Sequence, residues 1–173
     1  MNTNTFADVF RTHFDEKALV SLYPINPNPP TGTYLIRAEL PAHKVSRTMA
    51  IPATYTLDAL HGMIQQTVDF DDDHLYGFFF NLRDPYNGEQ YYDPRMEAGH
   101  ADGYPAETTT LASLNLYEGQ RFLYKFDFGA GWEFTVTVVR HLPDDEAETA
   151  TIVEQKGTSL EQYDTDWDDE EED

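Results

Sequence analysis

The sequence contains no cysteine, only four lysines and no long apolar run. Without cysteine the chain can form no disulfide, no thiolate metal site and no cysteine nucleophile. A membrane-spanning helix needs roughly 18 or more consecutive apolar residues, and no such stretch is present. Residues 1–5 also lack the basic and then apolar layout of a secretory signal peptide. We therefore expect a soluble cytoplasmic protein that has no membrane partner.

Basic residues are scarce in general, and the acidic excess is unevenly spread. The chain carries 32 Asp and Glu against 11 Lys and Arg, a formal net charge of −21. Residues 144–173 alone hold 14 of these acids and a single base, Lys156. Nucleic-acid binding depends on Lys and Arg that displace counterions from phosphate, so we expect no direct nucleic-acid contact. We expect a protein partner instead, and the charge makes a basic protein one candidate.

Composition divides the chain into four regions. With 40% hydrophobic and 14% aromatic residues, the chain can build one core. The predicted regions are an amphipathic helical appendage at 1–23, a Pro-rich linker at 24–32, a folded domain at 33–142 and an acidic, disordered tail at 143–173. The tail is expected to be extended because its like charges repel one another. Tyr163 and Trp167 give it two aromatic anchors for docking on a partner.

The domain shows strand and helix patterns in a definite order. Thr56 is a suitable N-cap for a helix at 57–69, along which apolar residues recur every three or four positions. The predicted strands are 33–40, 45–51, 75–80, 121–128 and 132–140, with a long loop at 83–110 in which residues 89–92 can form the second arm of a hairpin. We predict an α+β fold: a mixed or antiparallel sheet in β-β-α-β-(long loop)-β-β order, with one main helix packed on one face.

Four stretches together carry a resemblance to a known family. They are Ile36–Pro41 with Val45–Pro52, Leu57–Gln65, His74–Phe78 and Tyr124–Phe134. The Leu-His helix, the His-Leu-x-x-Phe strand and the Tyr-x-x-Asp-Phe-Gly-x-x-Trp hairpin, in this order, resemble the plasmid pRiA-type ORF-three-like domain family over about residues 33–142. This family has no established activity, so the resemblance implies a fold and no reaction. Ala130 and Phe134 stand where its members commonly carry an acid and a histidine.

Five residues are the candidates for a binding pocket: His61, His74, Tyr124, Asp127 and Trp132. His61 lies on the apolar face of the predicted helix, so we expect burial to lower its pKa, with Asp127 as the opposing carboxylate. Asp127 and Trp132 flank the glycine turn of the last hairpin, where a partner or ligand can reach them.

No nucleophile elbow, phosphate-binding loop, zinc-protease or dinucleotide motif is present. We therefore expect a binding or adaptor domain with no catalytic residues, no cofactor and no native metal. Two alternatives stay open. If His61, His74 and Asp127 converge, imidazole and carboxylate ligands suit zinc, and the protein is a metal-dependent enzyme of unknown reaction. If the acidic residues form ordered rows, it is an acidic decoy for a DNA-binding or defence protein.

Overall fold

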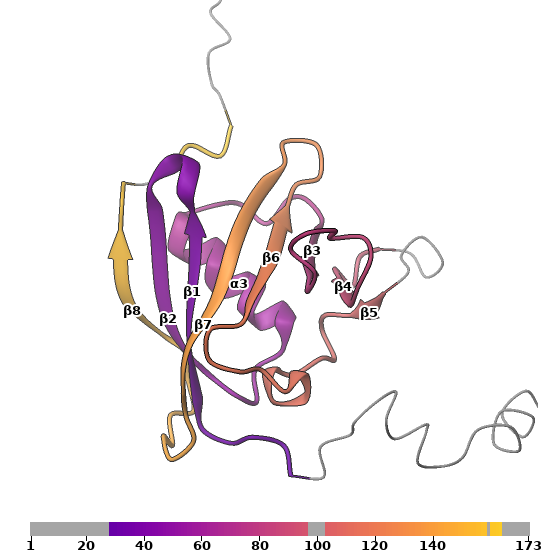
Figure 1. The fold of residues 1–173 in the computed structure, drawn as a ribbon. Coiled ribbons are helices and arrows are strands. Elements are labelled where there is room, and N and C mark those ends of the chain that lie inside the picture. The colour runs from indigo at the N-terminus through magenta and orange to yellow at the C-terminus, as the bar shows by residue number, and fades with distance from the viewer. Residues whose placement is uncertain (1–27, 97–102, 159, 164–173) are drawn as a thin grey trace, which may run out of the picture.

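The computed structural model describes residues 28–96, 103–158 and 160–163 (Figure 1). Its strands are β1 (Thr33–Leu40), β2 (Val45–Pro52), β3 (Tyr76–Phe79), β4 (Gln90–Tyr92), β5 (Tyr104–Pro105), β6 (Arg121–Phe126), β7 (Trp132–Leu142) and β8 (Thr151–Lys156). Its helices are α3 (Leu57–Val68) and two short 3-10 turns, η1 (Pro41–His43) and η2 (Leu111–Leu114). The appendage predicted at 1–23 and the docking residue Trp167 lie outside the described residues.

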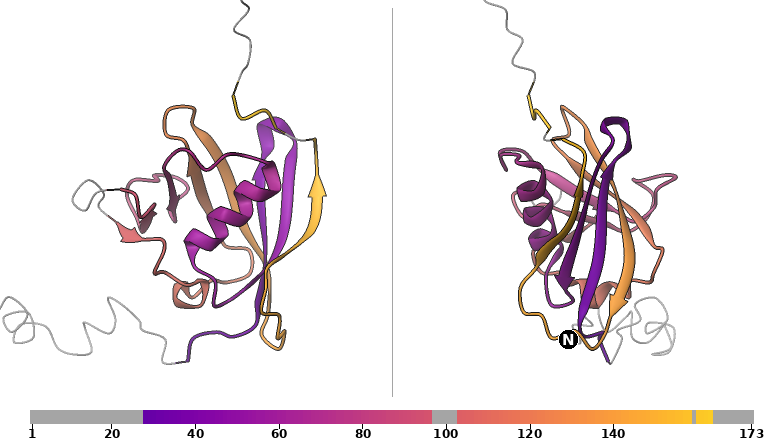
Figure 2. Two further views of the ribbon diagram at one scale, coloured as in Figure 1. Left: turned by 180° about the vertical axis from the view of Figure 1, so that it is seen from behind. Right: turned by 90° about the vertical axis from the view of Figure 1, so that its left-hand side faces the viewer.

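The eight strands form one sheet in the order β5-β4-β3-β6-β7-β1-β2-β8. β4 and β5 run parallel, and every other neighbouring pair is antiparallel. α3 lies across one face of this sheet, as both views in Figure 2 show. The fold is therefore α+β with a mixed sheet and one main helix in the described part, although strands dominate it.

The predicted element order was incomplete in two places. β4 and β5 lie in the segment expected to be a long loop, although the sequence allowed a hairpin arm at 89–92, where β4 is found, and β8 lies in the segment 143–173 that we expected to be disordered. β4 and β5 have three and two residues, too few to show an alternating pattern. All six residues of β8 are exposed, so this strand carries no alternation of buried and polar side chains.

α3 begins and ends where local chemistry requires it. Thr56 Oγ1 accepts a hydrogen bond from the Ala59 main-chain N–H at 3.1 Å, and Asp58 complements the positive end of the helix dipole. Asp69 ends the helix in the left-handed conformation, and its N–H donates to the Gln65 carbonyl. No helix in the described ranges is long and apolar enough to cross a membrane.

The core between α3 and the sheet is largely aromatic. Alternate residues of β6 (Phe122, Tyr124 and Phe126) are fully buried, and the Phe78 ring lies 4.9 Å from that of Tyr124 between centroids. Aromatic pairs across neighbouring strands bury a large area in a small sheet. This packing sets the phenol of Tyr124 beside the helix, where α3 carries His61.

Arg47 explains why β8 joins the sheet despite its exposed side chains. The Arg47 side chain is buried, its Nε donates to the Thr67 carbonyl at 2.9 Å, and its Nη1 donates to the Lys156 carbonyl at 2.5 Å. Because Thr67 lies in the last turn of α3, the guanidinium also meets the negative end of the helix dipole. One cation thus links β2, the helix and β8.

Candidate functional site

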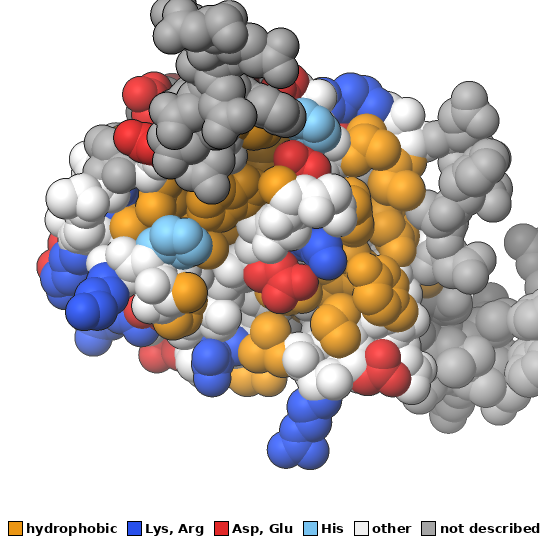
Figure 3. Space-filling view, turned by 90° about the horizontal axis from the view of Figure 1, so that it is seen from above, with side chains coloured by type: hydrophobic (Ala, Val, Ile, Leu, Met, Phe, Trp, Pro, Cys, Tyr) orange, Lys and Arg blue, Asp and Glu red, His pale blue; other side chains and the backbone are white. Residues whose placement is uncertain are grey.

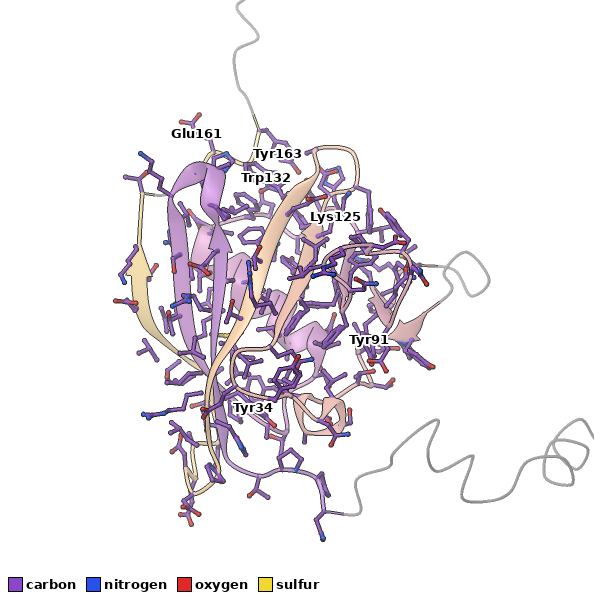
Figure 4. All side chains as sticks on the ribbon, viewed as in Figure 1. Tyr34, Tyr91, Lys125, Trp132, Glu161 and Tyr163 are labelled. Carbon is purple, nitrogen blue, oxygen red and sulfur yellow. The ribbon has the colours of Figure 1, made fainter. Side chains whose placement is uncertain are left out.

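The structure divides the five predicted pocket residues into separate groups. His61 and Tyr124 meet in the core, whereas His74 and Asp127 meet at the surface. Trp132 packs edge-on against Phe70, with ring centroids 4.9 Å apart. Figure 4 places Trp132 and Tyr163 at the same end of the sheet.

His61, Gln65, Tyr76 and Tyr124 form a buried set that we call the core network. His61 Nδ1 lies 2.7 Å from the Tyr124 hydroxyl, and Gln65 Nε2 donates to the same oxygen at 2.8 Å. With the Gln65 amide in this orientation, the phenol donates to His61 Nδ1, so the imidazole carries its proton on Nε2. The His61 ring stacks on Tyr76 with centroids 3.8 Å apart, and the Tyr76 hydroxyl donates to Asp58 at 2.5 Å.

Asp72 connects the core network to an arginine that the sequence analysis did not select. His61 Nε2 lies 3.2 Å from Asp72 Oδ1, a distance typical of an ion pair but without the alignment of a hydrogen bond. Arg95 Nη2 donates to the same Asp72 oxygen at 2.8 Å and to the His74 carbonyl at 2.8 Å. Arg95 also binds both oxygens of Asp93, whose side chain is fully buried. These bonds fix the loop after α3 to the end of β4.

Burial lowers the pKa of His61, as the sequence predicted, but the opposing carboxylate is a different one. Asp72 raises the pKa of His61 through its charge, followed by smaller effects of Asp58 and Asp93. The expected role of Asp127 was therefore wrong. Asp127 lies after β6 and faces His74, whereas Asp72, in the loop after α3, lies next to the imidazole of His61.

The core network is a carboxylate–imidazole–phenol chain, an arrangement that can relay a proton in an enzyme. The burial of His61 and Tyr124 argues against that role. The His61 side chain is 4% exposed and Tyr124 is 0% exposed, so neither can touch a substrate in this structure. His61 Nδ1 and the Tyr124 hydroxyl satisfy each other, whereas His61 Nε2 faces Asp72 without an aligned hydrogen bond, so the chain stabilises the core through the buried imidazole–phenol bond.

The second set, which we call the rim cluster, consists of Asp73, His74, Asp127 and Tyr163. His74 Nδ1 lies 2.8 Å from Asp73 Oδ1 and 3.7 Å from Asp127 Oδ2, and its side chain is 43% exposed. The Tyr163 hydroxyl donates to Asp73 at 2.6 Å. Seen from above in Figure 3, apolar side chains lie open among histidine and acidic side chains at this end of the molecule.

Asp127 holds its position because the hairpin turn needs it. Its backbone is left-handed, with φ of 52°. Its Oδ1 accepts hydrogen bonds from the main-chain N–H groups of Gly129 and Ala130 at 3.0 and 3.1 Å. An aspartate tolerates this conformation because its side chain can bond the following backbone. The other oxygen, Oδ2, is then directed toward His74.

Charge in the rim cluster favours the imidazolium form of His74. The hydrogen bond that His74 donates to the Asp73 carboxylate is the largest cause that raises the pKa of His74, and the charge of Asp127 adds to it. The hydrogen bond from Tyr163 is the largest cause that lowers the pKa of Asp73. The same bond to the Asp73 carboxylate raises the pKa of Tyr163 to about 12. The surface therefore has one titratable cation held among carboxylates.

The acidic loop, which we define as residues 69–74, already holds a piece of polypeptide. Gln162 Oε1 accepts from the Asp71 main-chain N–H at 2.6 Å, and Gln162 Nε2 donates to the Asp71 carbonyl at 2.9 Å. This reciprocal pair copies the hydrogen bonds that one peptide group makes with another across a sheet. Together with Tyr163 on Asp73, it fastens the segment 160–163 to the loop.

The structure does not assemble the three residues of the metal alternative. His74 and Asp127 approach each other, but His61 is bound to Tyr124 and faces Asp72. Among the residues that the structure describes, no group of three or more His, Asp or Glu side chains is placed to hold a metal ion.

Sequence reasoning missed Asp72, Asp93 and Arg95. These residues lie in segments taken for surface loops, and they meet across a long separation in the chain. One local signal was available: Asp93-Pro94-Arg95 sets an acid two residues before an arginine in a turn, so the guanidinium can fold back on the carboxylate. No local pattern shows that Asp72 is shared between Arg95 and His61.

Comparison with known proteins places the fold among uncharacterised relatives. The sequence is 28% identical over 116 residues to the uncharacterized protein y4hQ of Sinorhizobium fredii, a match that covers 65% of this chain and 55% of that protein. The structure resembles the crystal structure of MM3350, a protein of unknown function from Methanosarcina mazei Go1, with a TM-score of 0.60. That likeness has 24% sequence identity and covers 74% of this chain and 71% of the other, so it supports the fold alone.

A protein-family model matches most of the chain. The sequence model of the plasmid pRiA4b ORF-3-like proteins matches residues 34–162, a range that includes α3, the acidic loop, β8 and the segment that reaches the loop. The match confirms the resemblance predicted from the helix, strand and hairpin motifs, and it extends beyond residue 142. The chain therefore belongs to the plasmid pRiA4b ORF-3-like protein family.

Proposed function

We propose that this chain is a protein-binding adaptor domain without catalytic machinery. Its acidic loop and rim cluster hold a short, basic segment of a partner protein. One observation carries the proposal: Gln162 and Tyr163 of the same chain lie against the loop and bond it through Asp71 and Asp73. A surface that holds one polypeptide segment through main-chain groups can hold another of similar shape.

The charges of the loop favour binding of a basic segment over binding of the chain's own segment, residues 160–163. Asp71, Asp72 and Asp73 follow one another in the loop, and Asp127 lies beside them across His74. The chain continues after Tyr163 with ten residues, of which eight are Asp or Glu. Like charges therefore oppose the internal contact, whereas Lys or Arg in a partner would be attracted to the same carboxylates. The internal segment acts as a weak occupant that a basic partner displaces.

A defined peptide tests this proposal. The probe is an end-blocked hexapeptide, Lys-Lys-Gln-Tyr-Lys-Lys, which keeps the Gln-Tyr pair and replaces the acidic flank by lysine. Titration into the full-length chain is followed by amide NMR signals. We expect shifts at residues 71–74 and loss of the contact between Tyr163 and Asp73. Unchanged signals at residues 71–74 would rule the proposal out.

Two variants sharpen the result. Tyr163→Ala removes one of the two side chains that hold the internal segment on the loop, so the peptide should bind about fivefold more tightly, because it competes with a more weakly tethered segment. Asp73→Asn removes the carboxylate that accepts the phenol and should weaken binding. Asp84→Asn removes one exposed charge elsewhere and serves as the matched control. Equal affinities for Asp73→Asn and Asp84→Asn would show that only overall charge attracts the peptide.

A further inference from the structure

A second surface, separate from the acidic loop, lies at the outer edge of the sheet. β8 is the last strand in the sheet order, and within the described residues it pairs with β2 alone. Figure 1 shows it at one side of the molecule, and the right-hand view of Figure 2 looks onto it. The unpaired main-chain groups of an edge strand are a ready template for another strand.

The side chains of β8 are unusual for an edge that avoids partners. Ile152 is 39% exposed and Val153 is 57% exposed. The register slips by one residue between Thr48 and Met49 of β2, so Val153 is the additional residue of a bulge. At the opposite edge of the sheet, β5 has only two residues and offers no comparable ladder. At roughly 3.3 Å per residue, β8 presents an edge about 20 Å long.

Negative charge surrounds this edge. The loop that leads into β8 carries Asp144, Asp145, Glu146 and Glu148. The single base of the strand, Lys156, is paired with Glu154 at 3.1 Å. An extended segment lying along β8 would therefore meet an acidic approach at the Thr151 end, with no free cation on the strand to repel Lys or Arg.

A cleft lies beyond the Thr151 end of the edge. Its volume is about 480 Å³, and its lining includes Pro52 together with Asp144, Asp145 and Glu146. Ala50 pairs with Thr151, and Pro52 follows two residues later on β2, so the cleft begins near this end of β8 and extends past the ends of β1 and β7 at Gly32 and Pro143. No Lys or Arg of the part of the chain that the structure describes lines it. A basic side chain extending from a strand on β8 would find three carboxylates there.

Charge also distinguishes between possible occupants. A second copy of this chain would bring another net charge of −21 to the same edge, and like charges disfavour that encounter. A segment rich in Lys or Arg has the opposite sign. We propose that β8 is a docking edge for an extended, basic segment of another protein, which adds a ninth strand to the sheet and sets one Lys or Arg in the cleft. This inference goes beyond the proposed function, because it concerns a different surface and a different mode of contact.

The test uses an end-blocked decapeptide of alternating valine and lysine and the full-length chain. We expect amide shifts and slower hydrogen exchange in β8, with no change at residues 71–74. The same peptide N-methylated at every peptide bond has no main-chain N–H donor on either edge, so it cannot form a ladder and should not bind. Equal binding of both peptides would overturn strand addition. A second result would also overturn the proposal. If the protein sediments as a dimer without peptide, and the peptide slows hydrogen exchange at no amide of β8, the occupant of the edge is a second copy of the chain.

Charge variants complete the experiment. Asp144→Asn with Asp145→Asn should weaken the decapeptide about fivefold at low salt, because it removes two of the three carboxylates in the cleft. Asp84→Asn with Glu107→Gln removes two exposed charges elsewhere and should leave affinity nearly unchanged. Equal loss in both double variants would overturn the role of the cleft. Tyr163→Ala should not alter this binding, so failure here and failure of the proposed function give different results.

Discussion

His61 and His74 are chemically identical side chains, but their surroundings favour different charge states. His61 is packed in the core against Tyr76 and Tyr124, so the charged imidazolium is disfavoured. His74 stands at the surface between Asp73 and Asp127, so the charged form is favoured. The first histidine therefore stabilises the fold in its neutral form, and the second contributes positive charge beside the carboxylates of Asp73 and Asp127.

The lowered pKa of His61 predicts how the free energy of unfolding depends on pH. The unfolded chain, with a histidine pKa of about 6.5, binds more protons than the folded chain near that pH. Stability from this site is fully present above about pH 6.5 and is lost as pH falls toward the lower folded pKa. Denaturant unfolding between pH 8 and pH 5 should show a shallower slope for His61→Gln than for the wild type. His43→Gln, on the exposed η1 turn, is the control, and equal slopes for wild type and His61→Gln would contradict the prediction.

The raised pKa of His74 predicts a titration midpoint that is shifted in the opposite direction from that of His61. In an NMR titration, the midpoint of His74 should lie above about 6.5 and that of His61 below it. Asp73→Asn removes the largest cause of the rise, so it should lower the midpoint of His74 and leave that of His61 in place. Because a folded pKa above the unfolded value stabilises at low pH, this contribution is lost as pH rises through the folded pKa. A midpoint of His74 that Asp73→Asn does not move would contradict the assignment of the partner.

At the scale of elements, the strongly patterned segments could be predicted and the rest could not. Alternation in β1 and helical spacing in α3 follow directly from the burial of one face, and the structure has both. β8 could not be found in this way, since it joins the sheet through main-chain bonds and Arg47 rather than through buried side chains. The burial of His61 followed from its helical position, whereas its bonds to Asp72 and Tyr124 depend on how distant segments meet.

A substitution at Arg47 tests how β8 is attached to the sheet. Arg47→Met keeps much of the side-chain volume but removes the donors to Thr67 and Lys156. We expect the free energy of unfolding to fall by about 2 kcal/mol, as is typical when buried acceptors lose a charged donor. Hydrogen exchange in β8 should accelerate more than exchange in β6, because β8 loses a specific attachment. Arg83→Met, on an exposed loop, is the control. Equal acceleration in β8 and β6 would mean that Arg47 supports the fold as a whole.

Across the whole molecule, the charge is concentrated at the C-terminal side. The residues after Tyr163 add eight acids, so residues 1–163 carry a net charge of −13 (−21 + 8). Tyr163 is bound to the acidic loop, which carries Asp71, Asp72 and Asp73, and eight of the ten residues that follow Tyr163 in the sequence are acidic. This excess of negative charge favours both a positively charged partner and a dependence of stability on salt.

Salt should reveal this repulsion directly. The distance over which charges interact falls from about 30 Å at 0.01 M to about 3 Å at 1 M ionic strength. Raising NaCl over this range should increase the Tm of the full chain, and a rise of about 3 °C corresponds to roughly 1 kcal/mol for a protein of this size. A chain that ends at Tyr163 lacks eight of the repelling charges, so its Tm should rise by less. Calorimetry in NaCl and in KCl separates screening, which both salts produce equally, from binding of a particular cation. An equal rise for the two chains would place the repulsion within residues 1–163 alone, and the acidic residues after Tyr163 would then have no effect on the stability of the fold.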